Sequence, residues 1–446
     1  MPDVDVAVIG AGISGLACAE RLQRHGASVV VLESSPEVGG CITSVRSGEF
    51  LADGGPQTFA RSPELTELID NLGLGADAES APAAARRYIY LSGKLVQLPS
   101  SPRELLRSPI LSIGAKLRLL GERFVPRRRS DSDESVAAFV ERRAGRDVLD
   151  RVAEPFVAGI FAGDPKDLSV RSAFPALVQL ERAHGSILRA AQMRRSAPHA
   201  ETLTFTRGNQ LLPVALHARL GPAVRLNTPV SGIAVDDAGV MVDCSGSMRT
   251  KVYARAVVIA TPADSAAGIL AWADPEAAAI LRAIEHAPVA QIAIAYPRDA
   301  IGQPLDGFGF LAARGQGLRI LGAVWTSAIA SRRAPDDQAL VTAFLGGAMD
   351  RAIAKISDAE LASIAHSDLR RAMIIPDVRP NVVAGFRWDR AIPQYTLGHS
   401  DRVRRIETAL ARHPNIQLAG NFLSGISVTD CLKRSRLVAD AVVRAL

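Results

Sequence analysis

VDVAVIGAGISG, residues 4–15, decides the fold of this 446-residue chain. The apolar run 4–9 is typical of a buried β-strand, and the alanine-rich pattern after the glycines is typical of a helix that continues to about residue 25. A second apolar run, 27–32, ends on Glu33. This order of strand, glycine turn, helix, strand and acidic residue predicts a dinucleotide-binding βαβ unit.

Each glycine of the turn has a mechanical role in such a unit. Gly10 allows the tight turn out of the strand, Gly12 lets the backbone approach a pyrophosphate, and Gly15 lets the helix pack closely on the sheet. Glu33 follows Gly15 by eighteen residues, where a carboxylate can accept hydrogen bonds from ribose hydroxyls. Its charge would repel a phosphorylated ribose. The alternative is a tight turn in an ordinary α/β protein that binds no nucleotide.

Further glycines favour FAD over NAD as the dinucleotide. A glycine doublet, Gly39-Gly40, follows the second strand, and Asp53-Gly54-Gly55-Pro56-Gln57 follows a hairpin expected at 44–51. FAD is long and requires several close approaches of the backbone, although each glycine alone would also fit a simple turn.

The C-terminal end repeats the pattern of the N-terminal unit. A strand at 416–419 is followed by Gly420, Gly425 and a helix over 430–446. We expect the N-terminus of this second helix to face the flavin ring, because the amides and dipole of a helix N-terminus favour electron-rich groups.

The composition is that of a globular protein of two or three domains, with 48% hydrophobic and 22% charged residues. The formal net charge is +6, and much of the excess is paired arginine. Such charge fits a solvated surface, an anionic substrate, an anionic membrane surface or nucleic acid. Nucleic acid ranks last, because aromatic residues are only 5% and no nucleic-acid motif accompanies the charge.

The four cysteines, Cys18, Cys41, Cys244 and Cys431, are far apart and lack metal-binding spacing, so no metal site is expected. We interpret them as small buried residues of a reducing compartment. A strand begins almost at once, which leaves no room for a signal peptide, and no apolar run is long enough to cross a bilayer. The sequence therefore predicts a cytoplasmic protein, or one attached to the cytoplasmic side of the cell membrane.

Periodicity separates α/β parts from a mainly helical insertion at 99–200. Within the insertion, 112–125 is expected to be a basic amphipathic helix, and helical patterns also cover 135–153 and 172–195. A second hairpin is expected at 87–98. The other expected helices cover 61–75, 209–220, 275–286 and 357–374. The other expected strands cover 202–206, 224–227, 230–235, 240–244, 254–260, 291–296, 308–312, 318–325 and 339–345.

Several motifs go beyond a general dinucleotide fold. They are RYIY at 87–90, GIFAGDP at 159–165 with LSVRSAFP at 168–175, GFGFL at 307–311, IPQYTLGH at 392–399 and GISVTDC at 425–431. With them, the chain resembles the protoporphyrinogen oxidases, which are flavoenzymes of haem synthesis, and their coproporphyrinogen-oxidising relatives. Both belong to the amine-oxidase-like flavin superfamily. The resemblance covers essentially the whole chain.

The resemblance implies an α/β (α+β overall) fold of three parts. A Rossmann-like FAD-binding domain comprises 1–82, 207–262 and 405–446. A substrate domain built on a mixed sheet comprises 83–98, 184–206 and 263–404. A helical, membrane-binding insertion comprises 99–183 and matches the helical, basic region found from periodicity.

The resemblance also implies site residues. The implied cofactor is FAD, with binding residues Gly10, Gly12, Ser14, Gly15, Glu33, Ser34, Gly40, Cys41, Gly55, Pro56, Gln57, Thr58, Val230, Trp388, Gly420, Ile426, Ser427 and Val428. Arg87 is implied as the ligand of a substrate propionate. The implied apolar pocket around the tetrapyrrole consists of Gly159, Phe308, Gly309, Leu311, Ile320, Phe344 and Ile392. Glu37 departs from the family, whose members usually carry a basic residue there, and this bears on one flavin-phosphate contact.

The implied reaction is the oxidation of protoporphyrinogen IX to protoporphyrin IX by successive hydride transfers to flavin, which oxygen or another acceptor reoxidises. No catalytic base is assigned, because tautomerisation of the ring can move protons. His184, His286 and His399 have no partner spacing and are interpreted as structural. The alternatives are a coproporphyrinogen III oxidase, an amine oxidase or desaturase, and a non-catalytic flavin- or porphyrin-binding protein. The implied partners are the porphyrinogen, a membrane surface, a second copy of the chain and ferrochelatase.

Overall fold

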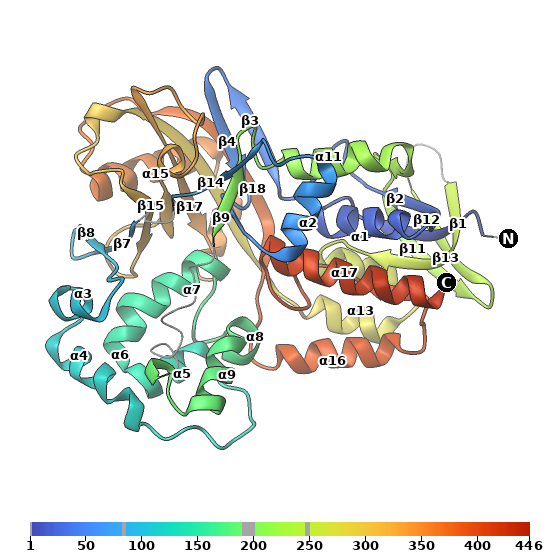
Figure 1. The fold of residues 1–446 in the computed structure, drawn as a ribbon, viewed down its shortest axis with the longest axis horizontal. Helices are drawn as coiled ribbons and strands as arrows, with labels where there is room; N and C mark the ends of the chain where they lie inside the picture. The colour runs from blue at the N-terminus through green and yellow to red at the C-terminus, as the bar shows by residue number, and fades with distance from the viewer. Residues whose placement is uncertain (1, 83–85, 190–200, 246–249) are drawn as a thin grey trace.

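The computed structural model describes residues 2–82, 86–189, 201–245 and 250–446. It contains two seven-stranded sheets and a layer of helices (Figure 1). The first sheet lies at the end of the molecule that carries both termini, and the second sheet and the helical layer lie at the other end (Figure 1).

The first sheet confirms the predicted βαβ unit. In its interior, β1 (Val4–Ile9) pairs in parallel with β2 (Val29–Leu32) on one side and with β13 (Thr250–Ile259) on the other. The strand order is β10-β2-β1-β13-β12-β11, and β19 pairs in parallel with the last residues of β13. The other strands of this sheet are β10 (Val224–Arg225), β11 (Val230–Asp236), β12 (Gly239–Cys244) and β19 (Ile416–Leu418).

Helices cover both faces of this sheet. Successive side chains of β1 point to opposite faces, so its apolar residues need a packing partner on each face. Val6 and Val8 pack with α1 (Ile13–Arg24), α2 (Pro63–Leu72), α11 (Leu211–Leu220) and α17 (Val428–Ala445). Ala7 and Ile9 pack on the other face with α12 (Ala263–Leu270), α13 (Pro275–Arg282) and α16 (His399–Leu410). Burial on both faces explains why these strands are continuous apolar runs.

The second sheet is mixed, with the order β18-β14-β17-β16-β15-β7-β8. Its long strand β14 (His286–Pro297) packs one face on α15 (Asp358–Met373), while Ala293 and Ala295 on the other face pack against β4 (Phe50–Gly54). The sheet therefore touches the flavin-side hairpin directly. Its other strands are β7 (Arg86–Leu91), β8 (Lys94–Gln97), β15 (Gly307–Ala312), β16 (Gly322–Val324), β17 (Gln338–Gly346) and β18 (Asn381–Pro393).

The insertion is helical, as predicted. Its helices are α3 (Pro102–Arg107), α4 (Ile113–Leu120), α5 (Val136–Ala144), α6 (Arg146–Val148), α7 (Glu154–Phe161), α8 (Val170–Ala173) and α9 (Pro175–His184). A 3₁₀ turn, η1 (Gly121–Phe124), continues α4, and a π-helical turn, η2 (Leu149–Ala153), leads into α7. Buried Arg143 of α5 pairs with Glu122 of η1 and Glu181 of α9 and so holds these elements together.

Short elements complete the fold. β3 (Thr43–Ser47) and β4 form the predicted hairpin, and β5 (Phe59–Ala60), β9 (Thr202–Phe205) and β6 (Ala78–Ser80) form a small sheet. The other short elements are η3 (Gly221–Ala223), η4 (Arg298–Ala300), α14 (Thr326–Ile329) and η5 (Arg351–Lys355). In the described part of the chain, no helix combines the length and the apolar character needed to span a bilayer.

Some element predictions are wrong. The strand expected at 318–325 is reduced to β16, because Gly315 and Gly317 adopt positive φ before it and Trp325 begins α14. The helix expected at 275–286 ends at Arg282, since His286 already belongs to β14. The sequence prediction omitted α12, α16 and β18 altogether, and the end of the helix expected at 172–195 lies outside the described residues.

The prediction that all four cysteines are buried is wrong for Cys41. Cys18, Cys244 and Cys431 are buried, but Cys41 is exposed. The reason is its position in the glycine loop beside the N-terminus of α1 rather than in a strand or helix of the core.

Candidate active site

The glycine turn between β1 and α1 has the geometry of a dinucleotide site. Gly10 has φ +102°, and a Cβ at Gly15 would lie 1.9 Å from the carbonyl oxygen of Gly10, so the fold itself requires both glycines. Gly12 differs, because a Cβ there would meet no atom within 4 Å and its φ of −72° suits any residue. A glycine at this position is therefore explained by the approach of a ligand and not by the fold.

Glu33 lies at the end of β2, against the same turn. Its carboxylate accepts hydrogen bonds from the backbone amides of Ala11 (2.6 Å) and Ser35 (2.9 Å) and from the hydroxyl of Ser34. The backbone amide of Thr228, just before β11, donates to the carbonyl of Glu33 at 2.7 Å. This contact places the start of β11, where Val230 lies, next to Glu33, the residue expected to bind the ribose.

A chain of glycine contacts leads away from the turn toward the second sheet. Gly39 donates to the carbonyl of Ala11 at 2.9 Å, and a Cβ at Gly40 would lie 3.5 Å from the Cα of Gly12. A Cβ at Gly55 would in turn lie 2.2 Å from the carbonyl oxygen of Cys41. Four of the predicted cofactor positions thus lie in an extended track of closely approaching backbone, which suits a long dinucleotide such as FAD; they are Gly12, Gly40, Cys41 and Gly55.

A buried polar network anchors the segment 53–58. The Arg333 guanidinium, on the loop before β17, pairs with the Asp53 carboxylate at 2.6 Å, and both side chains are fully buried. Asn209 donates its side-chain amide to the carbonyls of Pro56 (2.9 Å) and Gln57 (3.1 Å). Burial raises the pKa of Asp53, and the charge of Arg333 opposes that rise. The network fixes the backbone of residues that the sequence places along the flavin.

The second sheet supplies an aromatic wall beside this segment. Strand register puts Gln291 of β14 opposite Phe344 of β17 and Phe386 of β18. Phe386 stacks on Trp388 with the ring centroids 6.0 Å apart, and a Cβ at Gly54 would lie 2.6 Å from the Phe386 ring. The predicted residues Phe344 and Trp388 therefore lie on the sheet face that meets the 53–58 segment, while Gln291 and Phe386 are neighbours that the sequence interpretation missed.

The C-terminal unit closes the site from another side. β19 leads through Gly420 to α17, which begins with a capping box in which Ser427 and Asp430 exchange hydrogen bonds. The loop residue Ile426 packs in one apolar cluster with Ile392 of β18 and Phe161 of α7. The loop before α17 thus contacts both the second sheet and the helical insertion. The helix predicted over 430–446 is confirmed, and it begins two residues earlier, at Val428.

Apolar residues of α7 and β15 that the resemblance assigns to a substrate pocket lie close together. A Cβ at Gly159 would lie 2.4 Å from the Leu311 side chain, so α7 approaches β15 closely. Phe156 and Ile160 on the same helix are 46% and 37% exposed, although both are apolar. Sequence reasoning did not single out these two side chains. The signal in the sequence is their spacing, because two apolar residues four positions apart lie on the same face of a helix.

Arg87 lies at the rim of this region. Its guanidinium stands 4.9 Å from the ring centroid of Phe308, and β7 and β15 run parallel with Arg87 opposite Gly309. Gly309 has φ +126° and a Cβ there would lie 2.0 Å from the carbonyl oxygen of Ala323. The exposed guanidinium is therefore held by an aromatic ring and is available to an anion.

Ile320 does not join the other predicted pocket residues. It is 2% exposed and packs with Tyr90, Phe310 and Val341 in the core between the second sheet and α15. Its neighbour Leu321 instead packs in one cluster with Ala162, Val289 and Ile392. Leu321 thus packs with the predicted pocket residue Ile392, whereas Ile320 packs on the side of the sheet that faces α15.

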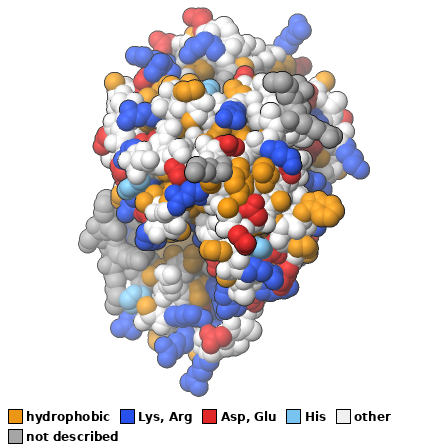
Figure 2. Space-filling view, turned by 90° about the vertical axis from the view of Figure 1, so that its right-hand side faces the viewer, with side chains coloured by type: hydrophobic (Ala, Val, Ile, Leu, Met, Phe, Trp, Pro, Cys, Tyr) orange, Lys and Arg blue, Asp and Glu red, His pale blue; other side chains and the backbone are white. Residues whose placement is uncertain are grey.

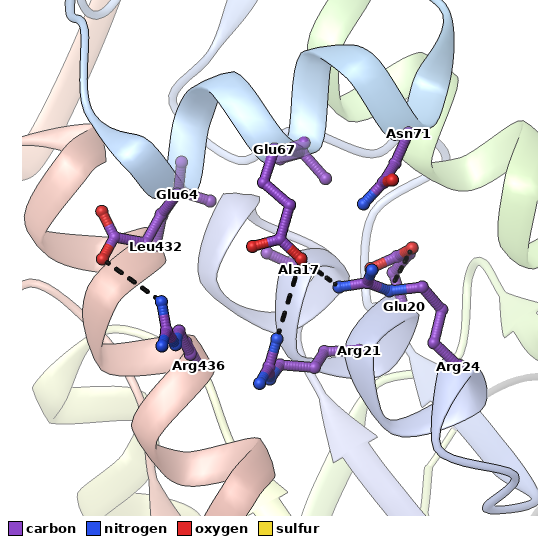
Figure 3. A pocket seen from close by; sticks show the side chains of 10 residues that line it. Ala17, Glu20, Arg21, Arg24, Glu64, Glu67, Asn71, Leu432 and Arg436 are labelled. Atoms are coloured by element: carbon purple, nitrogen blue, oxygen red, sulfur yellow. Dashed lines mark hydrogen bonds and ion pairs between the residues drawn. The ribbon is translucent and has the colours of Figure 1, made fainter.

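A small crevice between α1, α2 and α17 has a structural role (Figure 3). Its volume is about 40 Å³, which is far too small for a dinucleotide. Arg24 pairs with Glu20 and Glu67, Arg21 approaches Glu67, and Arg436 approaches Glu64 across it (Figure 3). These ion pairs fasten α1 to its neighbours and so orient the helix whose N-terminus forms the glycine turn.

The described residues contain no group of three or more His, Cys, Asp or Glu side chains that could hold a metal ion. On the end of the molecule with both termini, Lys and Arg side chains are spread among Asp and Glu side chains (Figure 2). The net positive charge is therefore not gathered into a single patch on this face. The chemistry of the site rests on backbone, apolar and aromatic groups, which fit a bound flavin.

Comparisons with known proteins agree with this site. The family described as flavin containing amine oxidoreductase matches residues 13–443. Protoporphyrinogen oxidase 1, chloroplastic, of Arabidopsis thaliana is 33% identical over 96% of this chain and 86% of its own length. Coproporphyrinogen III oxidase of Bacillus subtilis (strain 168) is 26% identical over 98% of this chain and 97% of its own length.

Solved structures share the fold. A protein from Exiguobacterium sp. 255-15, assigned as a protoporphyrinogen oxidase, has a TM-score of 0.85 at 23% identity, with full coverage of both chains. Cyclohexylamine oxidase from Brevibacterium oxydans IH-35A has a TM-score of 0.73 at 21% identity, over 100% of this chain and 99% of its own. The chain belongs to the flavin-containing amine oxidoreductase family, in the group of the protoporphyrinogen oxidases, and is an FAD-dependent oxidoreductase.

Proposed function

We propose that this enzyme oxidises protoporphyrinogen IX to protoporphyrin IX in tetrapyrrole biosynthesis. The observation that carries the proposal is the close approach of α7, which exposes Phe156 and Ile160, to Leu311 of β15, with the Arg87 guanidinium over the Phe308 ring of the same strand. A largely apolar ring with propionate tails matches this distribution of groups. The relatives with the higher identities are protoporphyrinogen oxidases, which supports the same substrate.

The chain contributes binding, orientation and exclusion of water. FAD, when bound, would supply the acceptor for hydride. The glycine turn and Glu33 would hold its pyrophosphate and ribose, and Gln291 fixes the backbone of Gly55, which would lie beside the flavin ring. Arg87 binds a propionate through charge-assisted hydrogen bonds, and the aromatic and aliphatic wall holds the macrocycle in place.

Coproporphyrinogen III is the second candidate substrate, because relatives with that name also match along their whole length. It carries more propionates than protoporphyrinogen IX. Arg87 is the one cation among the residues proposed for the pocket, which favours the substrate with fewer carboxylates.

A direct test uses the purified holoenzyme with both porphyrinogens. Under anaerobic conditions, protoporphyrinogen IX should bleach the flavin absorbance, and oxygen should then restore it with the appearance of porphyrin fluorescence. Bleaching by coproporphyrinogen III alone would move the assignment to the second candidate. Bleaching by an amine, or by neither porphyrinogen, would overturn the proposed function in favour of an amine oxidase or a non-catalytic flavoprotein.

The three-domain division belongs to the same proposal. It is supported by the first sheet, whose strands come from the three segments 1–82, 207–262 and 405–446 assigned to FAD. The helical part, 99–183, carries a row of exposed apolar side chains that we assign to peripheral contact with a membrane. Their exposed fractions are 59% for Leu106, 78% for Ile113, 64% for Leu117, 56% for Leu120 and 75% for Phe124. A cytoplasmic location, a homodimer and contact with ferrochelatase remain predictions from the resemblance.

A further inference from the structure

A groove of about 560 Å³ lies between the β7–β8 hairpin and α3. Its walls include strand β8, which is the outer edge of the second sheet, and the chain from Pro99 to Pro109. Figure 1 shows β8, α3 and α4 close together at one edge of the molecule. The groove is thus separate from the flavin track, which lies at the junction of the two sheets.

Cations outnumber acids among the residues that line the groove, whose other members are apolar or neutral. Arg86, Lys94 and Arg107 line it together with one acid, Glu104. The Glu104 carboxylate already accepts hydrogen bonds from the backbone amide and hydroxyl of Ser100, at 2.8 Å and 3.0 Å, and these contacts lower its pKa. Arg86 is paired with Asp306 at 2.5 Å. Lys94 and Arg107 are both exposed, so the charge that the groove offers to a ligand is positive.

The groove adjoins the exposed apolar row. Arg107 and Leu106 are consecutive on α3, so the row begins at the edge of the groove. The Lys116 ammonium of α4 donates to the carbonyl of Leu106 at 2.9 Å, which joins α3 to α4. Along α4 and η1, the spacing of Ile113, Leu117, Leu120 and Phe124 by four, three and four residues puts these side chains on one helical face.

We propose that this groove binds the phosphate-bearing headgroup of an anionic phospholipid while the apolar row enters the adjoining acyl layer. The two features match the two parts of a lipid, because a cationic groove and an exposed apolar face meet at Leu106 and Arg107. This inference rests on the membrane contact proposed above and adds a lipid preference to it. Lys94 and Arg107 are the residues that would contact the phosphate.

The test measures binding of the holoenzyme to vesicles of neutral phosphatidylcholine, with and without 30% phosphatidylglycerol, by flotation. The wild type should bind the anionic vesicles more tightly. The double variant K94A/R107A should lose roughly 25-fold in affinity for anionic vesicles, or about 5-fold per cation, and keep its binding to neutral ones. The variant I113S/F124S should lose binding to both kinds of vesicle.

Two matched variants separate the groove from general charge. K251A/R282A removes one exposed cation from the FAD-binding part and one from α13, far from the groove in sequence. R123A/R127A removes two exposed cations beside the apolar row but outside the groove. Both should keep the preference for anionic vesicles within about 3-fold. An equal loss in R123A/R127A would overturn the headgroup site in favour of diffuse attraction.

The remaining outcomes separate this inference from the membrane proposal. Unchanged binding of I113S/F124S would contradict membrane contact by the apolar row itself. A wild type that binds both vesicles equally would overturn only the lipid preference. Displacement from anionic vesicles by millimolar glycerol phosphate would assign the groove to a soluble phosphate compound and overturn the lipid headgroup.

Discussion

The Gln291 side chain holds both backbone groups of Gly55. Its Oε1 accepts from the Gly55 amide at 3.0 Å, and its Nε2 donates to the Gly55 carbonyl at 2.9 Å. Gln291 is 4% exposed and lies in the middle of β14. One side chain therefore fastens the second sheet to the segment that we propose to line the flavin, although 236 residues separate the two in sequence.

Replacing Gln291 should weaken flavin binding. Q291L leaves both groups of Gly55 without a partner, at a cost of roughly 1–3 kcal/mol for each buried group. We expect at least a 10-fold rise in the FAD dissociation constant, measured by quenching of flavin fluorescence with apoprotein, and a shifted visible flavin spectrum. Q291E can still accept a hydrogen bond from the Gly55 amide but cannot donate to the Gly55 carbonyl. Its FAD dissociation constant should therefore lie between those of the wild type and Q291L. Q338L, at the half-buried start of the neighbouring strand β17, is the control. An equal effect there would refute the role of Gln291.

Gly12 and Gly15 should respond differently to alanine. G15A drives a Cβ into the carbonyl of Gly10, so folded protein should be lost, whereas G12A meets open space and should leave the thermal stability of the apoprotein unchanged. G12A should nevertheless lower FAD affinity by about 10-fold or more, equivalent to ~1.4 kcal/mol, because the methyl group blocks the pyrophosphate. Calorimetry of the apoprotein measures the thermal stability, and titration with flavin measures the FAD affinity. Full FAD affinity in G12A would place the pyrophosphate elsewhere.

Arg87 and Arg86 are adjacent cations with different predicted roles. R87A should lower kcat/KM for protoporphyrinogen by about 5- to 150-fold, corresponding to the 1–3 kcal/mol typical of a hydrogen bond to a charged group. The loss should fall mainly on KM, because the propionate lies away from the reacting carbon. R86A removes a cation that is paired with Asp306 and should change kcat/KM less than 3-fold. The assignment fails if the two variants have the same kinetics.

His399 should make the folded state sensitive to acid. Burial lowers the pKa of His399 to about 4, with Arg402 adding to this effect and Asp133 opposing it. The unfolded chain, whose His pKa is about 6.5, then binds the proton more readily, so stability is complete above pH 6.5 and falls as the pH drops toward 4. The full loss is roughly 3 kcal/mol.

The variant H399F isolates this contribution. A phenyl ring keeps the stacking on Tyr395, whose ring centroid lies 4.2 Å from that of His399, and it cannot titrate. Urea unfolding at several pH values should show a smaller loss of stability in H399F than in the wild type between pH 6.5 and 4.5. Parallel curves for the two proteins would show that His399 does not contribute.

Local patterns were enough to predict the first βαβ unit, the hairpin before Asp53 and the helical insertion. The glycine turn is recognisable because its constraints act between residues that are close in sequence. The start of α17 was predictable for the same reason, since the glycines and the following apolar periodicity lie within one short segment.

Contacts across the fold were not predictable in this way. The role of Gln291 depends on the strand register of β14 with β17 and β18. The different surroundings of Ile320 and Leu321 depend on which side of the sheet each side chain occupies. β18 was not predicted, because it is an edge strand whose sequence mixes exposed charged residues and Gly385 with apolar residues. α16 carries charge on most of its surface and buries only a narrow stripe that includes Ile406 and Leu410.

Strand β13 is flanked by β1, from the first ten residues, and by β19, from the last thirty-one. A chain growing from its N-terminus therefore makes the glycine turn first and completes the sheet around it only after β19 has been made. The start of α17 follows β19, so the nascent chain should be unable to retain FAD before α17 has folded. Removing the last helix should abolish flavin incorporation even though every residue of the glycine turn is present.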